Sequence, residues 1–195
     1  MSAENHTKTL FFDLDGTLVD NFTALHRAYE HALQQVGEPA PTYEAVMKAV
    51  GGSSPLTMQR LIGEKKAPAA LPHFREYFEA HLLDDLRLLP GAWWIVKKLH
   101  DSGYMLAIFS NKKGHYARII CDHLKLTPYF KQIIGAEDTA WRKPQGKFSS
   151  YALEQLGTDA KHAVLIGDSL YDLQAAQAVG MPAYLVLTGT TEAGE

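Results

Sequence analysis

The sequence contains a single cysteine, Cys121, in 195 residues. One thiol cannot form an internal disulfide, and a chain so poor in cysteine is typical of a reducing compartment. Basic residues are also few, because 19 lysines and arginines face 22 aspartates and glutamates. The resulting net charge of -3 offers no basic surface for nucleic acid or for an anionic membrane. We therefore expect neither as a partner.

Long hydrophobic runs are missing as well. No apolar stretch approaches the roughly 20 residues that a membrane-spanning helix needs, and the first residues, MSAENHTK, lack the apolar core of a secretory signal. The nine histidines form no HxxxH pair and do not cluster with Cys121, which argues against zinc. These absences predict a soluble cytoplasmic protein. Its 46% hydrophobic composition is enough for a full core.

A short apolar segment that runs straight into two aspartates stands out near the start of the chain. Residues 9–12, TLFF, predict a buried strand that stops where Asp13 begins. Alternate residues of an extended chain share a face, so Asp13 and Asp15 project to the same side. Two carboxylates so placed repel each other unless a cation, a shared proton or both lie between them. Gly16 permits a tight turn directly afterwards.

The chain then becomes helical up to residue 89, without strand signals. Apolar spacing predicts helices over residues 21–36, 43–50, 55–62 and 72–86, and Thr42 is a suitable N-cap for the second. Pro90 and Gly91 look like a hinge. We therefore expect a small helical domain over 20–89, inserted into a main domain formed by 1–19 and 90–195.

Strand and helix alternate in the remainder of the chain. The pattern predicts strands over 104–109, 132–135, 163–166 and 183–187, separated by helices over 92–100, 114–124, 148–156 and 170–179. This order is typical of a Rossmann-like α/β fold, a doubly wound and mainly parallel sheet with helices on both faces. We expect one of Trp93 and Trp94 to pack in the core and the other under the helical domain. The last residues, TGTTEAGE, look like a frayed tail.

Ligands of such sheets bind beyond the carboxyl ends of the strands, and polar residues gather at those ends. Ser110 and Asn111 follow one strand near a predicted helix start, and Asp168 follows another. A third carboxylate beside Asp13 and Asp15 makes a set of oxygen ligands that suits Mg²⁺. The Ser110 hydroxyl and nearby backbone N–H groups suit phosphate oxygens. Taken singly, these residues are also ordinary turn and N-cap residues.

Four segments in this order resemble the motifs of the haloacid dehalogenase superfamily of aspartyl-phosphate phosphatases. They are DLDGT at 13–17, SNK at 110–112, RKP at 142–144 and GDSLYD at 167–172. The helical insertion resembles the cap domain of the subfamily that contains phosphoglycolate phosphatases and β-phosphoglucomutases, and residues 19–37 and 50–63 look most like the former. Asn21, where serine is commoner, and Gln145-Gly146 depart from the family pattern outside the catalytic positions.

This resemblance implies a Mg²⁺-dependent phosphatase that hydrolyses a small-molecule phosphate monoester, with phosphoglycolate a candidate. Asp13 would be the nucleophile that forms an aspartyl-phosphate, and Asp15 the general acid and base. Mg²⁺ would be bound by Asp13, by the backbone carbonyl of Asp15 and by Asp168.

The resemblance also implies a set of residues that would bind the phosphoryl oxygens. They are Thr17, Ser110, Asn111 and Lys143. Asp172 would orient Lys143 or a metal-bound water as a positioning residue. Substrate selectivity would come from the helical insertion, near Phe22, His26 and residues 51–54.

Three alternatives use the same fold. A phosphomutase of the β-phosphoglucomutase type would keep every catalytic residue and differ in the cap, so the sequence does not reject it. A dehalogenase would need no Mg²⁺, but such enzymes typically lack the second aspartate, so Asp15 counts against this alternative. A non-catalytic binding protein would require the loss of a nucleophile or metal ligand, and none is lost. We expect a monomer or a homodimer.

Overall fold

A computed structural model describes residues 9–190 of the chain. Its main body is a sheet in the order β5-β4-β1-β6-β7, and every neighbouring pair of these strands is parallel. This arrangement confirms the doubly wound α/β fold expected from the sequence. The strands are β1 (Thr9–Phe12), β4 (Met105–Lys113), β5 (Gln132–Ala136), β6 (Ala163–Gly167) and β7 (Ala183–Leu185).

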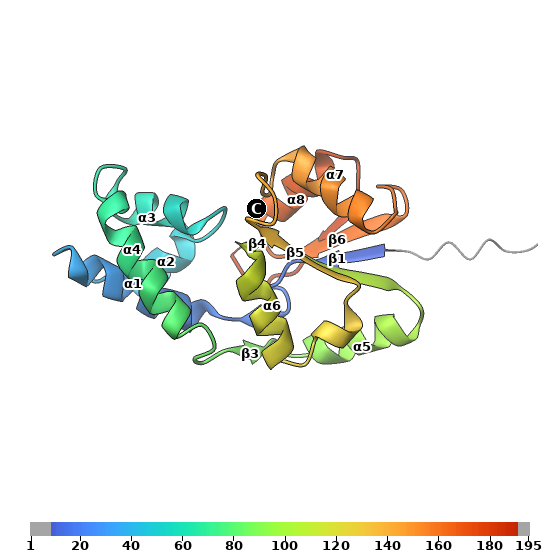
Figure 1. Cartoon of the computed structure of the whole chain (residues 1–195), viewed down its shortest axis with the longest axis horizontal. Helices are drawn as coiled ribbons and strands as arrows, with labels where there is room; N and C mark the ends of the chain where they lie inside the picture. The colour runs from blue at the N-terminus through green and yellow to red at the C-terminus, as the bar shows by residue number, and fades with distance from the viewer. Residues whose placement is uncertain (1–8, 191–195) are drawn as a thin grey trace, which may run out of the picture.

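Helices cover both faces of this sheet (Figure 1). In the buried strand β1, Leu10 and Phe12 belong to the core beneath α5 (Ala92–Asp101) and α6 (Gly114–His123). Phe11 points to the opposite core, beneath α7 (Gly146–Gln155) and α8 (Leu170–Gln177), where its ring meets that of Phe109 edge to face at 5.9 Å. The alternation along β1 therefore serves two cores at once.

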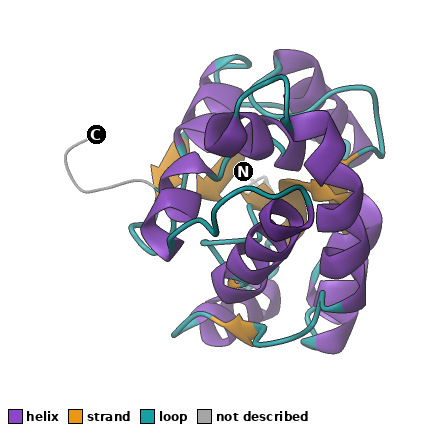
Figure 2. Cartoon of the chain, turned by 90° about the vertical axis from the view of Figure 1, so that its left-hand side faces the viewer, coloured by secondary structure: helices purple, strands orange, loops and turns teal. Residues whose placement is uncertain are grey.

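The helical insertion leaves the sheet directly after β1 and lies to one side of it (Figure 1). It contains α1 (Phe22–Gln35), α2 (Tyr43–Ala49), α3 (Ser54–Ile62) and α4 (Ala67–Ala80). Tyr29 of α1 stacks on Phe74 of α4 with 4.4 Å between ring centroids. Viewed from the insertion, helices enclose the strands of the sheet (Figure 2).

The two connections between the insertion and the sheet run side by side as a two-stranded antiparallel ribbon, β2 (Val19–Asp20) with β3 (Arg87–Leu88). This ribbon could not be predicted from the sequence, because each strand has only two residues. Arg87 also donates two hydrogen bonds, of 2.6 and 3.0 Å, to Asp20 Oδ2. The ribbon ties together the start and end of the insertion.

The fourth helix of the insertion lies closer to the N-terminus than the predicted range of 72–86. It begins at Ala67, with Pro68 in its first turn, and it continues through Pro72. Pro72 removes only the bond to the carbonyl of Pro68, which is exposed and can be hydrated. The helix ends at Ala80, because the next residue, His81, leaves the helical conformation with φ -117° and ψ 21°.

Three further expectations are corrected. Trp93 and Trp94 are 44% and 58% exposed, so neither packs in the core or under the insertion; Ala92 and Val96 are the buried residues of α5. Residues 188–190 are not frayed, because Thr188 and Thr190 hydrogen-bond to the sheet end. β4 runs on to Lys113, past the predicted end at 109. Residues 1–8 and 191–195, including the segment MSAENHTK, lie outside the described part of the chain.

A short 3-10 helix, Thr127–Tyr129, precedes β5. No helix in residues 9–190 is long and apolar enough to cross a membrane.

Candidate active site

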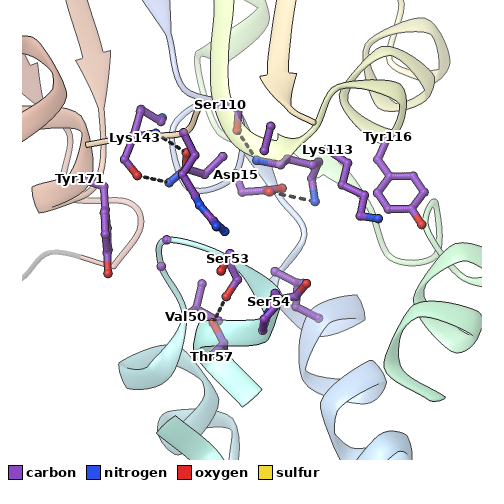
Figure 3. A pocket seen from close by; sticks show the side chains of 18 of the residues that line it. Asp15, Val50, Ser53, Ser54, Thr57, Ser110, Lys113, Tyr116, Lys143 and Tyr171 are labelled. Carbon is purple, nitrogen blue, oxygen red and sulfur yellow. Dashed lines mark hydrogen bonds and ion pairs between the residues drawn. The ribbon is translucent and has the colours of Figure 1, made fainter. Parts of the chain in front are cut away.

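A cavity of about 410 Å³ lies between the carboxyl ends of β1, β4 and β6 and the helical insertion. Asp13, Asp15, Ser110, Lys143 and Asp168 line it from the sheet. Ser53 and Ser54 of the insertion face these residues across the cavity (Figure 3). The predicted residues of four separate motifs therefore meet at one edge of the sheet.

Asp13 is the first residue after β1 and is 8% exposed. Its Oδ1 atom lies 3.0 Å from Lys143 Nζ, an ion pair, yet among the described residues it accepts no hydrogen bond of good geometry. Burial raises the pKa of Asp13, and the charges of Asp172 and Asp168 add to the rise, while Lys143 opposes it. A buried carboxylate oxygen that is paired with one ammonium still has a lone pair for a metal ion, so Asp13 Oδ1 is a candidate metal ligand.

Lys143 is a buried cation held by several partners. Its Nζ donates to Phe109 O at 2.9 Å and to Asp172 Oδ1 at 2.5 Å. Burial alone would lower the pKa of this lysine, but the charges of Asp13 and Asp172 outweigh burial and raise it. Asn111 holds the backbone of Lys143 from both sides, with hydrogen bonds of 2.8 Å to the N–H and 3.0 Å to the carbonyl. The lysine is therefore a fixed positive charge.

Asp172 is completely buried and its two oxygens are both engaged. Oδ1 accepts from Lys143, and Oδ2 accepts from Ser169 N at 3.1 Å and Ser169 Oγ at 2.5 Å in a capping box at the start of α8. The helix start thus fixes the carboxylate that orients Lys143.

Asp168 follows β6 and is 2% exposed. Its Oδ1 accepts from Thr17 Oγ1 at 3.3 Å, and its Oδ2 accepts from Thr190 N at 2.9 Å and Thr190 Oγ1 at 3.2 Å. Burial raises the pKa of Asp168, and the charge of Asp172 raises it further. Asp168 is thus a buried acid in a crowded group of acids.

Carboxylate oxygens of Asp13, Asp168 and Asp172 lie within 4.8 Å of one another. The charge of Asp172 raises the pKa of both Asp13 and Asp168, and a divalent cation would relieve the repulsion among these buried acids. The Asp13 Oδ1 atom, which keeps a lone pair beside its ion pair with Lys143, and the all-oxygen donor set fit Mg²⁺. Asp13 and Asp168 would hold the ion, since Asp172 is already engaged by Lys143 and Ser169.

Asp15 is held apart from that cluster. Its Oδ2 lies 2.9 Å from Lys112 Nζ, and its Oδ1 accepts from Asn21 Nδ2 at 3.4 Å. The side chain lines the cavity (Figure 3), so it can exchange protons with a bound molecule without being a side-chain ligand of the metal. Asn21, which departs from the family pattern, is thus a partner of Asp15.

The surroundings expected for the phosphate-binding residues change for Ser110, Asn111 and Thr17. Ser110 and Asn111 lie within the extended β4, whereas α6 begins only at Gly114, so these residues are not at a helix N-terminus as the sequence suggested. Thr17 does not line the cavity, because its hydroxyl is turned to Asp168. Its observed contact is with a candidate metal ligand and not with the place of a phosphate.

The insertion supplies part of the cavity wall, as expected. Phe22 and residues 51–54 line the cavity, whereas His26 does not; its Nε2 lies 3.0 Å from the carbonyl oxygen of Pro41. Trp141 and Arg75 also line the cavity.

Three residues of the site escaped the sequence reasoning. Lys112, which pairs with Asp15, lies in the motif SNK and Tyr171 in the motif GDSLYD, so their positions were visible but not their contacts. The Tyr171 hydroxyl accepts from Arg60 Nη2 at 2.8 Å, which joins α8 to the insertion. The sequence did not point to Thr190 as a site residue, because this threonine stands in a polar segment near the end of the given sequence.

Comparison with known proteins agrees with this geometry. The family profile described as haloacid dehalogenase-like hydrolase matches residues 10–186. A phosphoglycolate phosphatase of Caulobacter vibrioides is 31% identical over 191 residues, which cover 94% of this chain and 81% of that protein. A phosphoglycolate phosphatase of Aliivibrio fischeri is 30% identical over 196 residues, which cover 93% and 85% respectively.

Solved structures show the same similarity. The crystal structure of a predicted phosphoglycolate phosphatase from Haemophilus somnus 129pt superposes with a TM-score of 0.88 at 25% identity and covers 96% of this chain and 88% of that one. A predicted phosphatase from Clostridium acetobutylicum gives 0.85 at 26% identity, with 94% and 86% covered. The chain therefore belongs to the haloacid dehalogenase-like hydrolases and is similar to members named phosphoglycolate phosphatase.

Proposed function

We propose that this protein is a Mg²⁺-dependent phosphatase that hydrolyses a small-molecule phosphate monoester through an aspartyl-phosphate, with phosphoglycolate the first substrate to test. The main observation behind this proposal is Asp13, whose carboxylate opens onto the cavity beside Lys143 and belongs to a cluster of buried acids. Relatives that share 30–31% of its residues are named phosphoglycolate phosphatase, which supports the choice of substrate.

The first half of the reaction would transfer the phosphoryl group to the protein. An oxygen of Asp13 attacks phosphorus, the bond from phosphorus to the ester oxygen breaks, and Asp15 gives that oxygen a proton. Lys143 and Ser110 would stabilise the negative charge on the equatorial oxygens. Mg²⁺, when bound by Asp13, Asp168 and the backbone carbonyl of Asp15, supplies positive charge against the phosphoryl oxygens.

The second half would release phosphate. Asp15, now deprotonated, takes a proton from a water molecule whose oxygen attacks phosphorus, and the bond to Asp13 breaks. Lys112 and Asn21 keep the Asp15 carboxylate at the cavity during both proton transfers. A carboxylate that serves as acid and then as base must stay in one place, and these two contacts supply that restraint.

The insertion would act as a cap domain over residues 20–89. We propose that it moves about the ribbon formed by β2 and β3, with Pro90 and Gly91 as the return point, so that substrate enters and water is then excluded. We also propose a cytoplasmic protein that acts as a monomer or homodimer.

The test is phosphate release from phosphoglycolate, sugar phosphates and nucleotides, each measured with Mg²⁺ and with EDTA. We expect Mg²⁺-dependent release, and we expect Asp13→Asn to reduce it by at least about a thousandfold, as loss of a nucleophile does in other hydrolases. Circular dichroism and thermal unfolding would show that the variant is folded. Isomerised sugar phosphate without net phosphate release would identify a mutase instead.

Folded wild-type protein that released no phosphate from any of these esters, and isomerised none, would overturn the proposal.

A further inference from the structure

We infer that the segment Thr188–Thr190 is part of the metal site, and that Thr190 is a positioning residue that orients the Asp168 carboxylate toward Mg²⁺. This inference rests on the proposed function, because it concerns the same ion. It assigns a role to a stretch of chain that lies outside the four motifs and beyond β7.

The path of the chain brings this segment to the site. β7 ends at Leu185, and the next residue, Val186, still donates its N–H to Gly167 O at 2.8 Å. The chain then crosses to the turn after β1, where Thr188 Oγ1 donates to Gly16 O at 2.6 Å. It continues to Thr190, which lines the cavity. The chain thus runs from β7, which pairs with β6 just before Asp168, to the turn that follows Asp13.

Thr190 uses both of its donors on one atom. Its N–H and its hydroxyl donate to Asp168 Oδ2 at 2.9 and 3.2 Å. A carboxylate oxygen accepts about two hydrogen bonds, so Oδ2 is fully engaged. Oδ1 accepts only the 3.3 Å bond from Thr17 and retains a lone pair. The atom left for the metal is therefore Oδ1, and the two bonds to Oδ2 hold the rotation of the carboxylate that presents it.

Close packing against this carboxylate requires two glycines. A Cβ on Gly189 would lie 1.9 Å from Asp168 Oδ2, and a Cβ on Gly16 would lie 2.6 Å from the same atom. The Cβ of Gly16 would also lie 2.9 Å from the Cα of Gly189. The backbones at Gly16 and Gly189 therefore both pack against the Oδ2 end of the Asp168 carboxylate and contribute to its burial. The segment Thr188–Thr190 therefore forms part of the wall of the site.

Metal affinity is the property that such a contact affects. An aspartate whose oxygens are already fixed loses less conformational entropy when it binds an ion, and loss of such an outer contact typically weakens metal binding about tenfold to a hundredfold. Thr190 has no part in the proton transfers or in the attack on phosphorus. Its loss should raise the Kd for Mg²⁺ and leave kcat at saturating Mg²⁺ nearly unchanged.

The experiment measures Mg²⁺ binding by isothermal titration calorimetry, with Mg²⁺ alone as the probe, for wild type, Thr190→Val, Thr190→Ser and Thr158→Val. Thr190→Val removes the hydroxyl bond and keeps the N–H bond, so we expect about a tenfold rise in Kd. Thr190→Ser restores the hydroxyl and should stay close to wild type. Thr158→Val makes the same chemical change in the loop before β6, away from the cavity, and should have no effect.

Phosphate release as a function of Mg²⁺ concentration adds an independent comparison of the Mg²⁺ requirement and kcat. Thr188→Val removes the hydrogen bond that holds the segment to Gly16 O, so its Kd should also rise, and it serves as the second variant if Thr190→Val does not fold. Wild-type Kd in both altered proteins, or a loss of kcat with unchanged Kd, would overturn this inference and leave the phosphatase proposal standing. Absence of Mg²⁺ binding by the wild type would overturn both.

Discussion

At the scale of single residues, the main feature of the site is that several charged side chains are buried away from water. Asp13, Asp168 and Asp172 are buried together, and among the described residues Lys143 is the one buried cation beside them. One positive charge does not balance three negative ones, so protons or a metal ion must supply the remainder. This imbalance makes the stability of the metal-free protein depend on pH.

The pH dependence has a definite sign. Burial first, and then neighbouring carboxylates, raise the pKa of Asp13 from 3.8 to about 7 and that of Asp168 from 3.8 to about 6. Between the ordinary pKa of 3.8 and the raised value of about 7, the folded protein keeps protons that the unfolded chain has released. Raising the pH over this range therefore lowers the free energy of unfolding. In EDTA, the Tm should fall by several degrees between about pH 5 and pH 7.5, and saturating Mg²⁺ should reduce that fall.

Asp13→Asn is the control for this prediction, because it removes one of the titrating acids without changing the size of the side chain. Its Tm should decline less steeply with pH in EDTA than that of the wild type. An equal slope in both proteins would show that other groups cause the dependence.

Cys121 gives a second prediction at this scale. It is completely buried in α6, and burial raises the pKa of its thiol to about 12, with smaller contributions from the charges of Asp122 and Asp15. The thiolate is the reactive form, so the folded protein should resist a thiol reagent at about pH 8 and react only on unfolding. Rapid labelling of the native protein would contradict the burial of this side chain.

At the scale of elements, the sequence predicted the long periodic segments and missed short or context-dependent ones. The strands of the sheet and α1 lie close to their predicted positions because each buries a regular apolar pattern. The ribbon of β2 and β3 has no pattern of its own, since two residues are too few to show one. α4 was misplaced because Pro72 was taken for the start of the helix, whereas the helix begins at Ala67 with Pro68 in its first turn and continues through Pro72.

The same reasoning explains which site residues were found. Asp13, Asp168 and Lys143 were predicted because they stand in ordered motifs, and the structure brings them to one cavity. The contacts of Tyr171 and Thr190 depend on how distant segments pack, and nothing local records them. The exposed Trp93 and Trp94 show the opposite error, because one was expected in the core and the other under the insertion by residue type alone.

Contact between α8 and the insertion leads to a prediction about elements. The Tyr171 ring lies against Gly51 and Gly52, where a Cβ on Gly51 would be 2.9 Å from Tyr171 Cε2. Its hydroxyl accepts from Arg60, which also donates to Ala49 O at 2.9 Å. If this contact holds the insertion over the cavity, Tyr171→Phe should lower kcat/KM by about twofold to fivefold, as expected for one exposed hydrogen bond.

Tyr171→Ala removes the ring as well and should lower kcat/KM further, and Gly51→Ala should act in the same direction by pushing the loop away. Steady-state kinetics on the best phosphate ester from the panel would measure these effects. Unchanged kcat/KM in all three variants would show that this contact has no part in closure.

At the scale of the whole molecule, stability depends on the central strand. β1 pairs with β4 on one side and β6 on the other, and its side chains reach both cores. Few positions in the chain join as many parts of the fold. Substitutions in β1 should therefore cost more than substitutions of equal size elsewhere.

Phe11→Ala tests this expectation, since Phe11 is fully buried against Phe109. We expect a loss of about 3–5 kcal/mol in the free energy of unfolding, measured by urea denaturation. Trp94→Ala removes a larger aromatic side chain from an exposed position where it lies over Lys98, and it should change stability by about 0.5 kcal/mol or less. Comparable losses in the two variants would contradict the assignment of the core.

The position of β1 also has a consequence for how the protein is made. Its partner β4 emerges from the ribosome well before β6, which lies at residues 163–167 of 195. During most of translation one edge of an apolar strand therefore has no neighbour, a state that invites pairing with other chains. The carboxylates at positions 13 and 168 can meet only after β6 has been made, so a chain that stops before β6 lacks this cluster of acids.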